Sequence, residues 1–206
     1  MTLKTKLRKI YFAFSRRRLK NKSFTLISNN CLAGCVLHDF SMRFDIPTIN
    51  LFIPFPDYIK FLTDLKCYVN KEIEDITGDS PYPIGLLGGI IRLHFLHYNS
   101  FDEAVDAWKR RCRRIHWDNV RIVLVERDGC TESDLKAFDE LPYSHKIALV
   151  HKDYSNIKSS FLIKGFEECS ELGNVMTFVN SLGRKHYDQF NLSLIHISEP
   201  TRRRGI

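Results

Sequence analysis

Short apolar runs alternate with amphipathic stretches along residues 23–191, and this alternation constrains the fold more than any other feature of the sequence. Val120–Val125 is a nearly continuous apolar run, which is typical of a strand buried on both faces of a sheet. Ser100 and Glu103 form a capping box before a segment whose apolar residues recur with helical spacing. Strands that alternate with such helices indicate βαβ units. We therefore predict a single three-layer α/β domain with a mostly parallel central sheet and helices on both faces, leaving antiparallel late strands open.

The predicted elements follow one another without a linker or an internal repeat. We expect strands at residues 24–28, 48–53, 90–96, 120–125 and 146–150, with weaker strand patterns at 160–166 and 175–179. We expect helices at residues 30–42, 57–69, 101–112 and 131–141. The Gly-rich stretch at residues 85–89 precedes a strand, which is the wrong order for a loop that cradles phosphate.

The net charge of +7 is concentrated at the two ends of the chain. Residues 1–22 carry nine Lys and Arg and no acid, residues 192–206 contribute +2, and residues 23–191 therefore carry −4. A protein that follows a phosphate backbone usually has its basic stripe on the folded domain. The sequence thus predicts no nucleic-acid partner, and it divides into a basic arm (1–22), an α/β domain (23–191) and a tail (192–206).

The basic arm combines cations with apolar residues that would form a stripe on a helix. Its apolar interior is too short for a signal-peptide core, and no stretch reaches the roughly 18 apolar residues of a membrane-spanning helix. We expect a cytoplasmic protein with free thiols, whose arm binds an anionic membrane surface peripherally at the inner face of the membrane. A helix packed on the domain with its cations in solvent is the alternative.

The tail differs from the rest of the chain. Leu192–Arg202 resembles the conceptual translation of a transposase-type sequencing adapter. We therefore expect residues 192–206 to be artefactual and to contribute nothing to the core. The alternative is a genuine short strand with a basic end.

Polar side chains follow four of the predicted strands. Ligands of open α/β sheets bind beyond the carboxyl ends of the strands, so we expect these side chains to meet at one rim. The candidate catalytic residues are Asp128, His97 and Cys31, and the candidate substrate-binding residues are Asn29, Asn30, Tyr98, Arg127, Cys130, His151 and Lys152.

Several candidates also have simple structural roles. Asn29 and Asn30 could cap the following helix, and Asp128 with Gly129 could form a tight turn. Cys31 at a helix N-terminus would have a lowered pKa and could be a nucleophile, although a buried structural cysteine is commoner. The basic run at residues 109–114 suits a helix C-terminus, with a diphosphate clamp as the alternative.

The sequence contains no strong metal or cofactor motif. Cys31, Cys35 and His38 could line one helical face, but a zinc site usually has a second tight pair of ligands. P-loop, Gly-x-Gly-x-x-Gly, Asp-x-Asp and Ser-centred hydrolase motifs are absent. We expect neither a metal nor an organic cofactor.

A resemblance to a known family covers nearly the whole chain before the tail. The motifs that carry it are Ile27–Cys31, Pro47–Phe52, His94–Tyr98, Arg127–Thr131, Leu141–Tyr143 and Tyr187–Phe190. In this order they resemble bacterial exopolysaccharide-biosynthesis proteins known as domain of unknown function 1919. Residues 32–34 depart from the family, which tends to have an aromatic residue and two glycines there. The resemblance implies a cytosolic α/β protein linked to capsule or exopolysaccharide assembly.

Taken together, the sequence predicts a glycosyltransferase-like enzyme of surface-polysaccharide synthesis. Its partners would be a nucleotide sugar or a lipid-linked sugar acceptor. Asp128 or a rim histidine would be the general base, and Lys152, followed by Arg127, would bind donor phosphates. Two alternatives stay open: a non-catalytic assembly or regulatory subunit, and a cysteine-dependent hydrolase or acyltransferase that uses Cys31 or Cys130.

Overall fold

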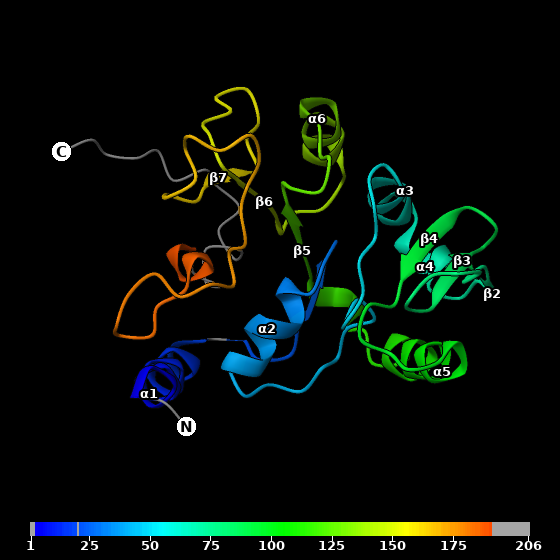
Figure 1. Ribbon diagram of the computed structural model, residues 1–206, viewed down its shortest axis with the longest axis horizontal. Coiled ribbons are helices and arrows are strands. Elements are labelled where there is room, and N and C mark those ends of the chain that lie inside the picture. The colour runs from blue at the N-terminus through cyan, green and yellow to red at the C-terminus, as the bar shows by residue number, and fades with distance from the viewer. Residues whose placement is uncertain (1–2, 20, 191–206) are drawn as a thin grey trace.

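The computed structural model describes residues 3–19 and 21–190, and its centre is a sheet of four parallel strands (Figure 1). Across the sheet the strands follow the order β1 (Thr25–Ser28), β5 (Val120–Val125), β6 (Lys146–Val150) and β7 (Ser160–Leu162). The last strand is parallel to its neighbour, so the antiparallel option does not occur in this sheet. The predicted α/β domain with a mostly parallel sheet is confirmed.

Apolar residues on both faces of the strands explain why the sheet is the middle layer. In β5, Ile122 and Leu124 belong to one hydrophobic cluster, whereas Val123 and Val125 belong to a second. Successive side chains of a strand point to opposite faces, so each cluster lies on one side of the sheet. The first cluster includes residues of α3 (Asp57–Thr63), α5 (Phe101–Cys112) and α6 (Glu132–Glu140), and the second includes residues of α1 (Leu3–Arg18) and α2 (Leu32–Asp39).

A second, antiparallel sheet stands apart from the central one. It consists of β2 (Ile73–Asp75), β3 (Ile84–Leu87) and β4 (Ile91–His94). The strand predicted at residues 90–96 therefore pairs with β3 and not with the parallel sheet. Gly88 and Gly89 have φ values of 59° and 72° and form the turn between β3 and β4. Residues 85–89 are thus half strand and half turn.

The strand predicted at residues 48–53 is wrong. Only Phe52 forms an isolated bridge, to His94. Asn50 has a φ of 59°, which interrupts an extended backbone, and Pro54 follows without an N–H to donate. Ile53 donates a backbone hydrogen bond of 2.8 Å to the Asn29 carbonyl, so this segment runs beside the end of β1. The bridge to His94 therefore places the end of β4 near the same edge.

Two further predictions need correction. The helix expected at residues 57–69 is divided at Asp64, whose φ of −145° breaks it and whose carboxylate accepts from Cys67 N to cap α4 (Leu65–Tyr68). The strand expected at residues 175–179 is wrong, because only Phe178 bridges, to Lys185. Two 3-10 helices complete the fold, η1 (Trp117–Asn119) and η2 (His186–Gln189).

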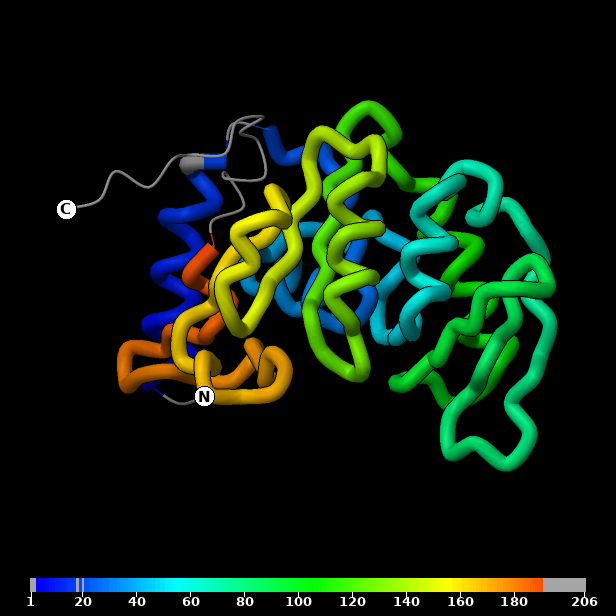
Figure 2. Tube along the Cα trace, turned by 90° about the horizontal axis from the view of Figure 1, so that it is seen from above, coloured from blue at the N-terminus to red at the C-terminus, as the bar shows by residue number. Residues whose placement is uncertain are grey.

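The basic arm packs onto the domain as α1 (Figure 2). Phe12 is buried in the second cluster, with its ring centroid 4.7 Å from that of Phe40. Arg8 is buried as well and contacts the chain near η2. Within residues 3–19 and 21–190 no helix is both long and apolar enough to cross a bilayer. The predicted artefactual tail, residues 192–206, lies outside the described residues.

Candidate functional site

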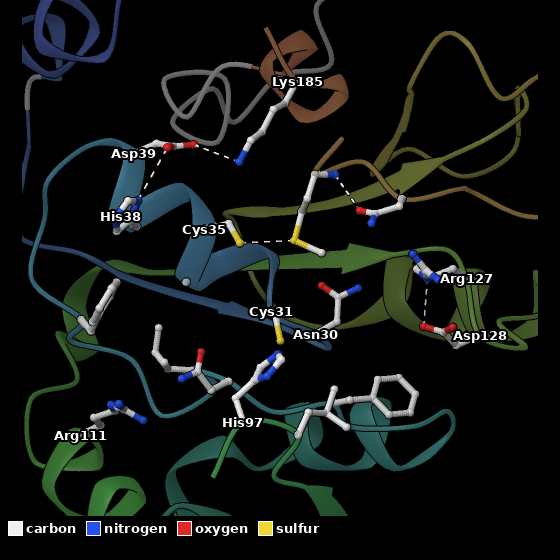
Figure 3. Close-up of a pocket in the computed structure, with 18 residues that line it drawn as sticks. Asn30, Cys31, Cys35, His38, Asp39, His97, Arg111, Arg127, Asp128 and Lys185 are labelled. Carbon is white, nitrogen blue, oxygen red and sulfur yellow. Dashed lines mark hydrogen bonds and ion pairs between the residues drawn. The ribbon is translucent and has the colours of Figure 1, made fainter. Parts of the chain in front are cut away.

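A pocket of about 770 Å³ lies at the carboxyl ends of β1 and β5 (Figure 3). It is lined by three strand-end loops, by α2 and by the segment between β7 and η2. Its polar lining includes Asn30, Cys31, Asp39, Asn50, His97, Arg111, Arg127, Asp128, Asn174 and Lys185, and its apolar wall includes Phe44, Ile49, Phe52, Leu96 and Met176. The volume lies within the range of sites that bind small molecules.

The loop after β1 is fixed by side chains that bond to the backbone. Asn29 is fully buried, and its amide accepts from Val125 N at 2.9 Å and donates to Val125 O at 3.2 Å. Ser28 Oγ accepts from Ala33 N at 3.1 Å. Asn30 Oδ1 accepts from Leu32 N at 3.0 Å, which holds the first turn of α2. Asn29 therefore ties β1 to β5 away from the pocket, and of these two asparagines only Asn30 lines the cavity.

Cys31 lines the pocket, and its thiol is partly buried there. Burial, reinforced by Cys35, raises the pKa of its thiol to about 11, whereas the sequence predicted a lowered pKa. The desolvation of a thiolate thus outweighs the helix N-terminus at this position. Cys35 also lines the pocket with a raised pKa, caused first by burial, and its Sγ lies 3.3 Å from Met176 Sδ.

The loop after β5 presents an ion pair to the pocket. Arg127 Nε lies 3.0 Å from Asp128 Oδ2. Asp128 and Gly129 have φ values of 59° and 85°, so the predicted tight turn is also present. The Asp128 side chain is 40% exposed. The turn is therefore compatible with a ligand-facing role of Asp128, because its carboxylate stays partly exposed in the pocket lining.

His97 reaches the pocket from β4, although that strand lies outside the central sheet. The Phe52–His94 bridge brings residues 94–97 against residues 49–53. His97 is exposed, and in Figure 3 its ring points toward the Cys31 sulfur. Tyr98 is next to it but does not line the cavity: its hydroxyl donates to Ile49 O at 3.3 Å and accepts from Arg111. Tyr98 thus holds Arg111, which does line the pocket.

A buried charge cluster forms the wall opposite the Arg127–Asp128 pair. Asp39 accepts from Arg8 Nη2 at 2.6 Å, and Lys185 Nζ lies 3.9 Å from the same carboxylate. Burial raises the pKa of Asp39, but hydrogen bonds from Arg8 and Tyr187 outweigh it and leave that pKa lowered. Asp39 is therefore an ionised carboxylate paired with Arg8, and the Lys185 ammonium, which also lines the pocket, ends beside it in Figure 3.

Three further candidates lie away from the cavity. His151 is buried, with Nδ1 2.6 Å from Glu126 Oε2, and Tyr154 donates to Glu126 Oε1 at 2.8 Å. This cluster joins the ends of β5 and β6 internally. Lys152 is exposed outside the lining, with Nζ 5.2 Å from the centre of the Tyr154 ring. Cys130 is also outside the lining, and burial, followed by the nearby carboxylate of Asp134, raises its pKa.

The candidates thus divide into two groups. Asn30, Cys31, His97, Arg127 and Asp128 share the pocket, whereas Asn29, Tyr98, Cys130, His151 and Lys152 lie outside its lining. The sequence missed Asp39, Asn50, Asn174 and Lys185. Only Asn50 offered a signal, because Asn is one of the residues that adopt a positive φ most readily. Arg111 was noted within the basic run but not assigned to the site. All six cysteines are free, and the described residues contain no group of three or more metal-ligating side chains suited to an ion.

Comparison with known proteins identifies the family. The model of the family named "Domain of unknown function (DUF1919)" matches residues 3–195. The chain belongs to this family. The match includes α1 as well as both sheets, so the basic arm is part of the family's domain. A protein of Haemophilus influenzae described as "Uncharacterized protein" is 36% identical over 176 residues, which cover 85% of each chain.

Proposed function

We propose that the protein is a glycosyltransferase-like enzyme that binds a nucleotide-activated sugar in the pocket described above. The observation that supports this most is one cavity lined by Arg111, Arg127 and Lys185, by the Asp128 carboxylate and by an apolar wall. Asp39 is the second carboxylate of the lining, and it shares Arg8 with the buried Asp188, so four cations (Arg8, Arg111, Arg127 and Lys185) face three carboxylates (Asp39, Asp128 and Asp188). The pocket therefore has an excess of positive charge, which favours an anionic ligand such as a diphosphate.

The three cations line different sides of the cavity, so a donor's diphosphate would be attracted into it and could bind any of them. Arg111 and Lys185 approach the cavity from α5 and from the segment before η2, and Arg127 approaches from the end of β5. Phe52, Phe44 and Met176 offer apolar surface against which a base or a sugar ring can pack. In this proposal Arg111 and Arg127 replace Lys152, the cation first expected to bind phosphate.

Asp128 would accept the proton of the acceptor hydroxyl. A general base must reach that proton directly or through one water, and Asp128 is half-exposed at the mouth of the cavity. Its carboxylate is held by Arg127 in the unliganded protein. Donor phosphate would compete for the Arg127 guanidinium, so that binding of the donor would release Asp128 toward the acceptor.

The resemblance to exopolysaccharide-biosynthesis proteins supports the wider assignment. A role in capsule or exopolysaccharide synthesis, on the cytoplasmic side of the membrane, rests on this resemblance and not on the pocket. A cysteine-dependent hydrolase or acyltransferase fits less well, because burial raises the pKa values of both Cys31 and Cys130. One observation favours a non-catalytic binding subunit as the second candidate, namely the Arg127–Asp128 pair, which occupies the carboxylate.

Thermal denaturation with a panel of nucleotide sugars tests donor binding. A donor present at one hundred times its dissociation constant stabilises the folded protein by about 2.7 kcal/mol. We expect stabilisation by at least one nucleotide sugar and a weaker effect in Arg111→Gln. Lys152→Gln is the matched control, since Lys152 is exposed outside the cavity. No stabilisation by any donor, or equal losses in both variants, would argue against this pocket as the donor site.

A further inference from the structure

We propose that α1 and the neighbouring loop at residues 178–182 form a surface that binds the anionic face of a lipid bilayer. This inference goes beyond the proposed sugar transfer and does not depend on it. Of the ten large apolar side chains that are exposed among the described residues, seven come from these two segments. They are Leu3, Ile10, Tyr11 and Phe14 on α1, and Phe178, Val179 and Leu182 on the loop.

The exposed apolar residues of α1 occupy the face that points away from the domain. Leu3, Ile10 and Phe14 are 71%, 57% and 61% exposed, and their spacing of seven and four places them on one stripe. Arg8 and Phe12 lie on the opposite side of the helix and are 5% and 4% exposed. Burial of Arg8 and Phe12 therefore fixes the rotation of α1 against the domain. No other element of the described residues covers the stripe of Leu3, Ile10 and Phe14.

The loop lies beside α1, and its exposed apolar side chains together with this stripe make up the apolar patch. The Arg184 guanidinium lies 3.6 Å from the centre of the Tyr11 ring, and Lys4 Nζ lies 5.9 Å from the centre of the Phe178 ring. Leu182 is 65% exposed beside these contacts. Figures 1 and 2 both show the loop next to α1, at the end of the molecule opposite the second sheet. Two segments more than 160 positions apart in sequence thus expose apolar side chains together.

The charges around the patch favour a bilayer over another protein. Lys4, Lys6, Lys9, Arg16 and Arg17 are exposed on α1, which has no acidic residue, and the loop from Asn174 to Lys185 has none either. A surface with an apolar centre and only cations at its edge matches a bilayer, in which anionic headgroups cover a hydrocarbon interior. Lysine is depleted at protein–protein interfaces, so the three exposed lysines of α1 favour a bilayer over a protein partner.

Vesicle co-sedimentation with the full-length chain tests the proposal. We expect binding to vesicles of phosphatidylcholine with phosphatidylglycerol, weaker binding to phosphatidylcholine alone, and a decline as salt is raised. Ile10→Ser with Phe14→Ser should lower the affinity by about tenfold or more, because both side chains would enter the interface. Lys6→Gln should lower it by roughly fivefold.

Ile90→Ser is the matched control, since Ile90 is 55% exposed in the turn between β3 and β4 at the far end of the molecule. It should bind vesicles like the parent chain. Absence of parent binding to the anionic vesicles, or equal binding by the Ile10→Ser, Phe14→Ser protein, would overturn the proposal. A concentration-dependent dimer that these two substitutions abolish, without vesicle binding, would instead assign the patch to a second copy of the chain. Nucleotide-sugar stabilisation of the double variant should be unchanged, which separates this test from that of the pocket.

Discussion

Replacement of Arg8 by Met should destabilise the protein strongly, even though Arg8 lies in the basic arm. Its guanidinium donates to Asp39 Oδ2 at 2.9 and 2.6 Å, to Asp188 Oδ2 at 2.7 Å, to the Gly183 carbonyl at 2.8 Å and to the Tyr187 hydroxyl at 2.7 Å. The side chains of Arg8, Asp39 and Asp188 are 5%, 11% and 4% exposed. The substitution therefore removes the cation that pairs with Asp188 and leaves Asp39 with only Lys185, whose Nζ lies 3.9 Å away.

The expected loss follows from that geometry. Removal of one partner of a buried ion pair costs about 3–5 kcal/mol, mainly because the remaining charge is desolvated. For a domain of this size such a loss lowers the melting temperature by roughly 6–20 °C. Chemical denaturation of Arg8→Met beside Lys9→Met measures it, since Lys9 is exposed on the same helix and should change stability by less than about 0.5 kcal/mol.

The stability difference between Arg8→Met and the parent should depend on pH. The pKa of Asp39 is lowered in the folded protein, so its contribution is fully present above the ordinary value of 3.8 and is lost as pH falls through the lowered pKa. In Arg8→Met the carboxylates can protonate more easily, and the difference from the parent should therefore shrink below pH 4 or so.

A rescue experiment distinguishes unpaired charge from lost packing. Adding Asp39→Asn and Asp188→Asn to Arg8→Met should restore part of the stability, because the two carboxylates that lost Arg8 then carry no charge. An Arg8→Met protein within about 1 kcal/mol of the parent, or a triple variant no more stable than Arg8→Met, would refute this reasoning.

Two further predictions concern the loop after β1. Asn29→Ala should cost about 1–3 kcal/mol of unfolding free energy, measured by urea titration, because the buried Val125 N–H and carbonyl would lose their partner; a change no larger than that of Asn30→Ala would contradict this. Cys31 should react with iodoacetamide at pH 7.5 far more slowly than the exposed Cys67 and Cys169, as followed by peptide mass spectrometry, because its pKa is about 11; equal rates would contradict the raised pKa.

The sequence anticipated the central sheet because its strands are buried on both faces. β5 is recognisable as an apolar run, and its end correctly identified Arg127 and Asp128 as neighbours of the residues after β1. The strand at residues 90–96 was assigned to the wrong sheet, because alternating apolar residues suit an antiparallel strand as well as a parallel one. His97 lines the pocket all the same, through the Phe52–His94 bridge.

Other parts of the site left no local pattern to find. His151 turns inward because Glu126, 25 positions away, binds both its backbone N–H and its ring. Asp39 can line the pocket as a buried carboxylate only because it pairs with Arg8, 31 positions away. Lys185 belongs to a segment without a strand or helix. These positions depend on long-range ion pairs and hydrogen bonds, which no periodicity of the sequence encodes.

The most direct test of the account is the rate of sugar transfer by Asp128→Asn. Asn tolerates the left-handed backbone at this position, where φ is 59°, and retains hydrogen bonding while it removes the basic carboxylate. With the nucleotide sugar that stabilises the parent and a panel of sugar acceptors, release of the nucleoside diphosphate measures the rate. We predict a rate lower by roughly 10²- to 10⁴-fold, with the melting temperature retained and donor binding no weaker, since Arg127 no longer pairs with a carboxylate. A variant that transfers sugar as fast as the parent would contradict the assignment of Asp128 as the base.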